Sequence, residues 1–117
     1  MKLIRFLTIS VLLLFPILGM AQSNDEKIQG TWRLDTTDGK FMEWTFDKGS
    51  FTQKGSPSIS QKGKYRIVQE MGVQIKVELY EQEGTQGTEN RQIIILIDAK
   101  RKELSIDRKS GFKQKVE

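Results

Sequence analysis

The feature that most constrains this chain is a period of two in its hydrophobic residues, which is strictest over residues 73–80. In that segment an apolar residue alternates with a more polar one. Successive side chains of a β-strand point to opposite faces, so the pattern predicts a strand with one face in a core and the other in water. The residues predicted to point inward are Val73, Ile75, Val77 and Leu79.

The same period recurs along most of the chain and predicts an all-β fold. Short strands separated by Gly- and Asp-containing turns are expected, and the only helical signal is a single turn from Asn24. The count is seven or eight strands, which favours an antiparallel barrel or sandwich in up-and-down order. The expected strands cover residues 28–34, 41–46, 51–54, 64–69, 73–80, 91–98 and 104–108, with a last one near 112–116.

Two segments depart from simple alternation. Residues 55–63 are rich in Gly and Ser, and they predict either the longest loop or a weak edge strand interrupted by a loop. If the barrel has a mobile lid, we expect it there. Residues 93–97 are apolar on both faces, so the outward residues Ile94 and Leu96 are expected to be covered or to lie at a contact with another subunit.

Residues 1–21 have the layout of a secretory signal peptide. Lys2 and Arg5 precede an apolar run over residues 6–18, and small residues follow it, as at a cleavage site. The structural alternative is an uncleaved anchor, but a membrane span needs about 20 apolar residues. Cleavage would leave residues 22–117 as one small domain that is periplasmic or secreted and not anchored in a membrane.

The composition argues against most kinds of chemistry. The chain has no cysteine and no histidine, so the usual nucleophile–base pairs and zinc sites cannot form. Residues 22–117 carry 17 basic and 15 acidic residues, which is not the basic excess of a nucleic-acid-binding domain. We therefore predict a protein that is not an enzyme, holds no metal or cofactor and binds no nucleic acid.

The segment Gly30-Thr31-Trp32, behind an export signal and ahead of up-and-down strands, resembles the lipocalin superfamily and especially its short bacterial exported members. The resemblance implies a small antiparallel up-and-down β-barrel of about eight strands. It also implies that Gly30 and Trp32 close one end of the barrel, with Arg108 from the final strand lying over the indole. Such a cation–π contact is worth about 0.5–2 kcal/mol.

Four aromatic residues are expected on the inner face of this barrel: Trp44, Phe46, Phe51 and Tyr65. They could line a cup for a small apolar or amphipathic ligand, gated by residues 55–63, or they could fill the barrel. The first possibility makes the protein a non-catalytic binding protein.

The second possibility makes the protein a filled barrel that acts through its surface, as an interaction or inhibitory module in the cell envelope. Ile94, Leu96 and the basic segment 100–115, with seven basic and two acidic residues, are the expected contact surface for a partner. The alternative is a purely structural role for the basic segment, as a solvent-exposed edge strand and tail, because exposed lysines discourage unwanted strand pairing.

Overall fold

A computed structural model describes residues 23–115, and the predicted signal peptide at residues 1–21 lies outside this part of the chain. One short helix, α2 (Asn24–Ile28), is followed here by eight strands. The strands are β1 (Gly30–Asp35), β2 (Phe41–Asp47), β3 (Ser50–Gly55), β4 (Ile59–Met71), β5 (Gln74–Gly84), β6 (Arg91–Asp98), β7 (Glu103–Ile106) and β8 (Lys109–Gln114).

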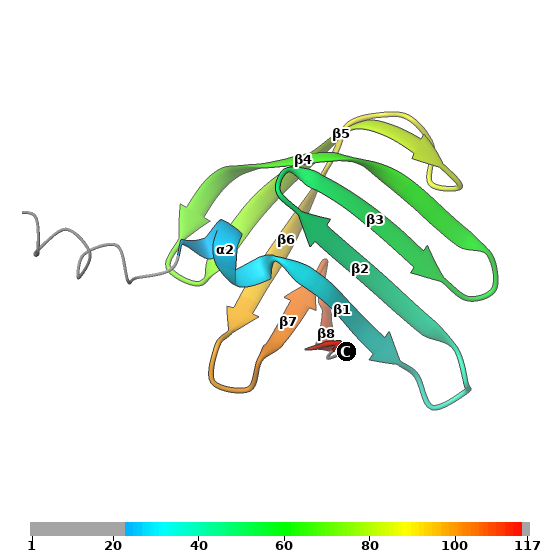
Figure 1. Cartoon of the computed structure of the whole chain (residues 1–117), viewed down its shortest axis with the longest axis horizontal. Coiled ribbons are helices and arrows are strands. Elements are labelled where there is room, and N and C mark those ends of the chain that lie inside the picture. The colour runs from blue at the N-terminus through cyan, green and yellow to red at the C-terminus, as the bar shows by residue number, and fades with distance from the viewer. Residues whose placement is uncertain (1–22, 116–117) are drawn as a thin grey trace, which may run out of the picture.

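These strands form a closed antiparallel barrel in the order of the chain (Figure 1). Each strand pairs with the next, and β8 pairs with β1 to complete the circle. The expected all-β, up-and-down barrel of about eight strands is therefore confirmed. Closure pairs β1 with β8 at two positions only, so this seam is shorter than the other ladders.

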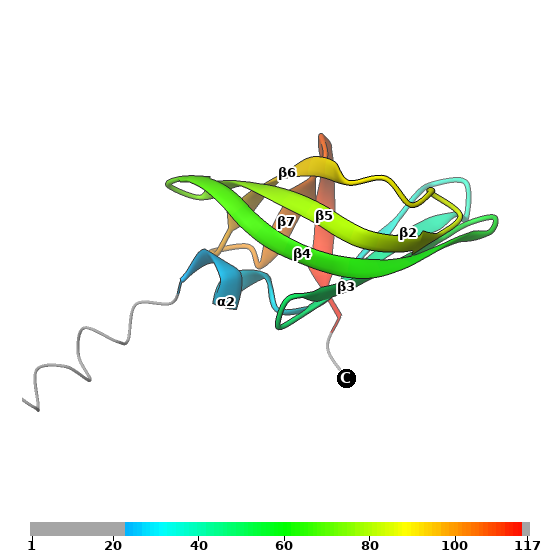
Figure 2. The same cartoon turned by 90° about the horizontal axis from the view of Figure 1, so that it is seen from above.

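The two ends of the barrel differ, and we name them by what lies there. The helix end carries α2 and the turns β2–β3, β4–β5 and β6–β7, whereas the mouth end carries the other four turns between strands. Seen from above, β4 and β5 are long curved strands that run from one end to the other (Figure 2). The two ends of the interior therefore receive residues from opposite ends of the same strands.

The predicted alternation places one side of each strand in the core. Along β5, Ile75, Val77 and Leu79 are fully buried, as expected. Val73 was expected with them but is 51% exposed, because β5 begins only at Gln74 and Val73 belongs to the turn that follows Met71. The other buried aliphatic and phenylalanine side chains of β6 to β8 are Ile93, Ile95, Ile97, Leu104, Ile106 and Phe112.

The prediction of a long loop at residues 55–63 is wrong. Strand β3 continues to Gly55 and β4 begins at Ile59, so only three residues turn between them. The alternative prediction, an edge strand interrupted by a loop, is closer to the structure. However, β3 and β4 are each paired on both sides, so neither is an edge strand. Gly63, which contributed to the loop prediction, stands in a strand because it faces a ring: a β-carbon there would lie 2.9 Å from Cε1 of Phe51.

Helix α2 begins with a capping box and is tied to the helix end. The Glu26 amide donates to Oγ of Ser23 at 3.1 Å, and the Ser23 amide donates to the Glu26 carboxylate at 3.2 Å. Asn24 Nδ2 donates to the carbonyl of Gly72 at 2.9 Å, and Ile28 is fully buried. Among residues 23–115 no helix has the length and apolarity needed to cross a membrane.

Candidate functional site

The four aromatic residues predicted on the inner face do come together. Trp44, Phe46, Phe51 and Tyr65 are each at most 3% exposed. The Trp44 ring lies 5.8 Å from Phe46 and 5.9 Å from Phe51, centroid to centroid, and Phe46 meets Tyr65 edge-on at 5.3 Å. This aromatic cluster is an apolar floor inside β2, β3 and β4.

The residues predicted to close the barrel are placed differently. Trp32 is 4% exposed at the helix end, and its Nε1 donates to the carbonyl of Ile28 at 2.8 Å, so α2 supplies its hydrogen-bond partner. Gly30 begins the strand with a φ of +112°. Arg108 is exposed in the β7–β8 turn at the mouth end, so the predicted contact with Trp32 is wrong. The reason is that β7 ends at Ile106 and the chain has already turned at Arg108.

Above the aromatic cluster, the interior becomes polar toward the mouth end. Gln53, Gln61 and Gln82 come from β3, β4 and β5, and each is at most 5% exposed. Arg91 opens β6 beside them and is partly buried. We call these four residues the polar mouth.

Arg91 is held in the polar mouth by neutral oxygens. Its Nη2 donates to Oε1 of Gln53 at 3.0 Å, and its Nε donates to Oε1 of Gln82 at 3.3 Å. The guanidinium carbon lies 6.0 Å from the centroid of the Trp44 ring, at the edge of cation–π range. An arginine does lie over a tryptophan, therefore, but the pair is not the one predicted.

The charge on Arg91 is only weakly compensated. Burial lowers the pKa of its guanidinium, and the carboxylate of Asp107 in the β7–β8 turn acts in the opposite direction. Among the described residues, Arg91 makes no ion pair within 4.0 Å. A cation in the barrel interior thus has amide oxygens as its nearest partners.

The loop over residues 85–90 covers the polar mouth and is fastened by its glutamines. Gln61 Nε2 donates to the carbonyl of Gly87 at 2.8 Å, and Gln61 Oε1 accepts from the amide of Gln86 at 2.9 Å. Gln82 Nε2 donates to the carbonyl of Glu89. All six loop residues are exposed, so hydrogen bonds rather than apolar packing hold the loop in place.

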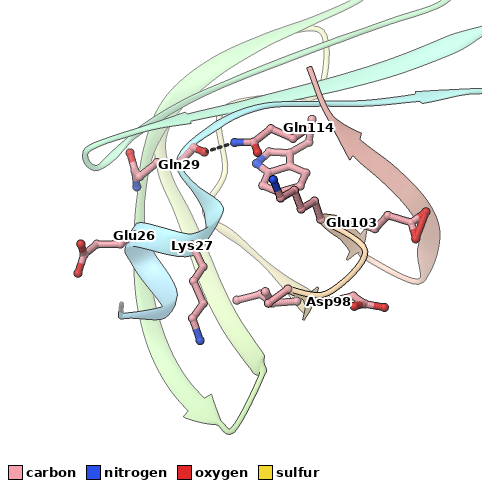
Figure 3. Close-up of a pocket in the computed structure, with 10 residues that line it drawn as sticks. Glu26, Lys27, Gln29, Asp98, Glu103 and Gln114 are labelled. Carbon is pink, nitrogen blue, oxygen red and sulfur yellow. Dashed lines mark hydrogen bonds between the residues drawn. The ribbon is translucent and has the colours of Figure 1, made fainter. Parts of the chain in front are cut away.

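At the helix end, α2 and the β6–β7 turn enclose a pocket of about 250 Å³ (Figure 3). Gln114 reaches across it and donates to the carbonyl of Gln29 at 3.4 Å. Glu26 points away from the pocket in this view, and the other charged residues that line it are Lys27, Asp98, Lys102 and Glu103. Charges of both signs surround Trp32 here, and none of them is buried.

Tyr65 links the aromatic cluster to the helix end. Its hydroxyl donates to Oδ1 of Asp25 at 2.7 Å and accepts from Nε2 of Gln29 at 2.7 Å. Burial, together with the hydrogen bond to Asp25, raises the pKa of Tyr65 to about 12. The phenol is therefore a neutral donor that fixes α2 to the barrel. No group of three or more acidic residues within 23–115 could hold a metal ion.

On the outside, β6 is not covered by the described chain. Ile94 and Leu96 are 42% and 43% exposed, and they pair across the sheet with Lys76 and Gln74 of β5. With Val68, Met71 and Val73, which are also exposed, they form a surface that we call the outer apolar face.

The basic segment does not gather beside the outer apolar face. Lys100, Arg101 and Lys102 lie in the β6–β7 turn at the helix end. Arg108 lies in the β7–β8 turn and Lys109 begins β8, both at the mouth end. Lys113 pairs with Arg33 of β1 across the sheet, and Lys115 lies 3.8 Å from Glu43. The cations of the segment are therefore spread over both ends of the barrel and strand β8 rather than gathered in a single patch.

No family model matches the chain, and neither does any curated protein or solved structure. The likeness to lipocalins therefore stays a prediction that rests on Gly30-Thr31-Trp32 and on the strand order.

The polar mouth was missed when the sequence was interpreted through its apolar residues alone. Gln53, Gln61 and Arg91 do stand in phase with the buried residues Phe51, Tyr65 and Ile93. Assigning each residue to the inner or outer face by its position along the strand, whatever its polarity, would have predicted these three as inward.

Proposed function

We propose that this chain is an exported, non-catalytic barrel that binds a small amphipathic molecule inside its mouth end. The observation that carries the proposal is the division of the interior. An apolar aromatic cluster lies in the middle of the barrel, and a polar mouth with one cation lies above it. Sites for small ligands combine an apolar lining with a few convergent polar groups in this way.

Entry to the interior would be through the loop at residues 85–90. The loop is exposed and is held by a few hydrogen bonds to Gln61 and Gln82, so it can open without exposing a core. A ligand that reached the aromatic cluster would displace the buried side chains of Gln53, Gln61 and Gln82, which lie above it. The gate is thus proposed for a different loop from the one the sequence indicated.

The polar groups inside the barrel support binding rather than catalysis. They are three amides and one guanidinium. None of these groups exchanges a proton near neutral pH, so none is a general acid or base there. Glu83, which precedes the loop, and Glu89, which lies within it, are both exposed to water.

Native mass spectrometry tests the proposal. The mature protein is purified from its own cell envelope without detergent, and a bound small mass is expected. Loss of that mass in Trp44→Ala, with retention in a variant of an exposed residue such as Thr52→Ala, would locate the ligand in the interior. A bare chain from several growth conditions would contradict the proposal.

Export has its own test. Sequencing of the mature N-terminus is expected to begin at Gln22, since the small residues before it fit a cleavage site. Recovery of the full chain from the cytoplasm would contradict this part of the proposal and leave the ligand site untouched.

The outer apolar face supports a second candidate function, that of an interaction module in the cell envelope. Ile94 and Leu96 lie on β6 and Met71 lies on β4, on either side of β5, and each of the three side chains is more than 40% exposed. Large exposed apolar patches mark interaction sites. We expect the double variant Ile94→Lys, Leu96→Lys to lose a protein that co-purifies with wild type, whereas Thr52→Lys keeps it. If the wild-type protein purifies without a partner, the interaction module is contradicted and the ligand-binding function remains.

A further inference from the structure

We infer that Arg91 binds a carboxylate, so that the ligand of this barrel is a small carboxylic acid with an apolar tail. The inference rests on the proposed function and specifies the chemistry of its ligand. The carboxylate would lie in the polar mouth, and the tail would lie against Trp44 and the aromatic cluster.

The first argument is electrostatic. A charge inside a protein is costly unless an opposite charge or several good hydrogen bonds compensate it. Arg91 has two hydrogen bonds to neutral amide oxygens, and a guanidinium has five N–H donors. The other acidic groups in this region do not neutralise it: Glu43 is paired outside the barrel with Arg33 and Lys115.

Asp107 is the acidic group that acts on Arg91 from the neighbouring turn. It favours the charged form of the guanidinium, but it lies beyond ion-pair distance. Asp107 is also exposed, so water screens much of its field. The interior therefore keeps a positive potential that an anion entering the mouth would meet.

The second argument concerns the hydrogen-bond donors around Arg91. Gln53 accepts from Arg91 with its oxygen, while its Nε2 points to Sδ of Met42 at 3.8 Å. A thioether is a weak acceptor, so this amide N–H would gain from a better one. A carboxylate could accept from the guanidinium fork and from Gln53 Nε2 together, because its two oxygens match donors that lie side by side.

The third argument selects a single negative charge. The polar mouth holds one cation, and its other members are neutral amides. A dianionic phosphate would keep an uncompensated charge in the same interior, whereas a carboxylate neutralises Arg91 fully. The Trp44 ring beside the guanidinium supplies the adjoining apolar surface for the tail.

The experiment compares three compounds that share one tail: octanoate, octanol and octylamine. Binding to the wild-type mature protein is measured by titration calorimetry at neutral pH. We expect octanoate to bind at least about tenfold more tightly than octanol, and octylamine to bind most weakly. This comparison needs no variant, so it does not depend on how substitutions affect folding.

Variants then assign the preference to Arg91. Arg91→Gln is expected to abolish the preference for octanoate, and Arg91→Lys is expected to retain part of it because the charge remains. The matched control is Arg108→Gln, which removes an exposed arginine from the same end of the barrel. Circular dichroism melts establish that each variant is folded.

The outcomes separate the two proposals. Equal binding of octanoate and octanol, or a preference that survives Arg91→Gln, overturns the carboxylate and leaves the binding function standing. A failure of all three compounds to bind, together with a bare mass from the cell envelope, overturns both. A preference for octanoate over octanol that is lost in Arg91→Gln but kept in Arg108→Gln supports both the binding function and the carboxylate ligand.

Discussion

At the scale of single residues, two side chains with a polar tip hold α2 against the barrel. Trp32 donates to the carbonyl of Ile28, and Tyr65 bridges Asp25 and Gln29. Both rings are buried, so each contributes apolar area and one or two hydrogen bonds that water cannot replace. The helix is only five residues long, and such a helix has little stability of its own.

We predict that Trp32→Ala lowers the free energy of unfolding by about 3–5 kcal/mol. The change removes a buried ring and leaves the Ile28 carbonyl without its donor. Because whole domains are stable by about 5–15 kcal/mol, the variant is expected to be partly unfolded in a thermal melt. Trp32→Phe is the matched control and should recover most of the packing. A melt of Trp32→Ala that matches wild type would show that something other than this ring closes the helix end.

We predict that Tyr65→Phe costs about 1–2 kcal/mol near neutral pH, since it removes the hydroxyl that joins two residues of the N-terminal segment. The wild-type pKa of about 12 lies above the value of 10.0 for a free tyrosine. The native state therefore keeps its proton where the unfolded chain has lost it. This contribution to stability is complete below pH 10 and is lost as the pH rises toward 12.

Denaturant unfolding from about pH 9 upward measures this effect as the difference between wild type and Tyr65→Phe. Titration of lysines affects both proteins alike and cancels in the difference. The gap in stability should narrow between pH 10 and 12. A constant gap over this range would contradict the role given to the hydroxyl.

At the scale of elements, β6 is a strand with one face in the core and the other exposed to solvent. Its residues Ile93, Ile95 and Ile97 point into the core, while Ile94 and Leu96 face outward between polar neighbours. The sequence predicted Ile94 and Leu96 on the outer face, but because every one of these positions is apolar it could not tell whether that face is covered. Within the described chain it is not.

We predict unequal effects of one substitution at adjacent positions of this strand. Ile95→Ala should cost about 2–4 kcal/mol, because Ile95 is fully buried and leaves a cavity. Ile94→Ala should cost less than about 1 kcal/mol, because that side chain is 42% exposed. Urea unfolding of the two variants measures both values. Similar losses at both positions would mean that the outer apolar face is covered in solution.

The end of β5 shows where a period of two fails. Extended from Leu79, the period would place Glu81 inside the barrel. Instead Glu81 takes a φ of +49°, and Glu81 and Gln82 together oppose Gly63 of β4 as a bulge. Gln82 is turned inward and Glu81 outward as a result. A bulge depends on the partner strand, so the sequence of β5 alone could not predict this member of the polar mouth.

At the scale of the whole molecule, the barrel closes through its weakest ladder. Strands β1 and β8 pair at two positions, Trp32 with Gln114 and Arg33 with Lys113. One further backbone bond joins the Lys115 amide to the Thr31 carbonyl at 2.8 Å. The ladder between β4 and β5 is several times longer. Closure therefore depends on few bonds between residues that are far apart in the sequence.

We predict that this seam opens more often than the rest of the barrel. In native-state hydrogen exchange, the amides of β8 should exchange before those of β5, since short ladders open at lower free energy. Exchange read by mass spectrometry on peptides from the two strands measures this directly. Equal protection of both strands at all times would indicate that the barrel opens only by global unfolding.

The number and polarity of the strands could be predicted from the sequence, because alternation and turn residues are local signals. The neighbours of Trp32 could not be predicted: Arg108 was expected over the ring, but β7 ends before it, and the indole donates instead to the carbonyl of Ile28. The aromatic cluster was found because its members are apolar. Arg91 was overlooked because a charged residue at an inward position is unexpected until the oxygens around it are known.

The pairing of β8 with β1 also makes the order of the strands cyclic. Every strand has the neighbour that precedes it and the neighbour that follows it, and the first and last strands are no exception. The place where the backbone is interrupted is then incidental to the architecture. The ends could be joined by a flexible linker and the chain reopened in the exposed turn around Gly39, and all eight ladders would still be specified.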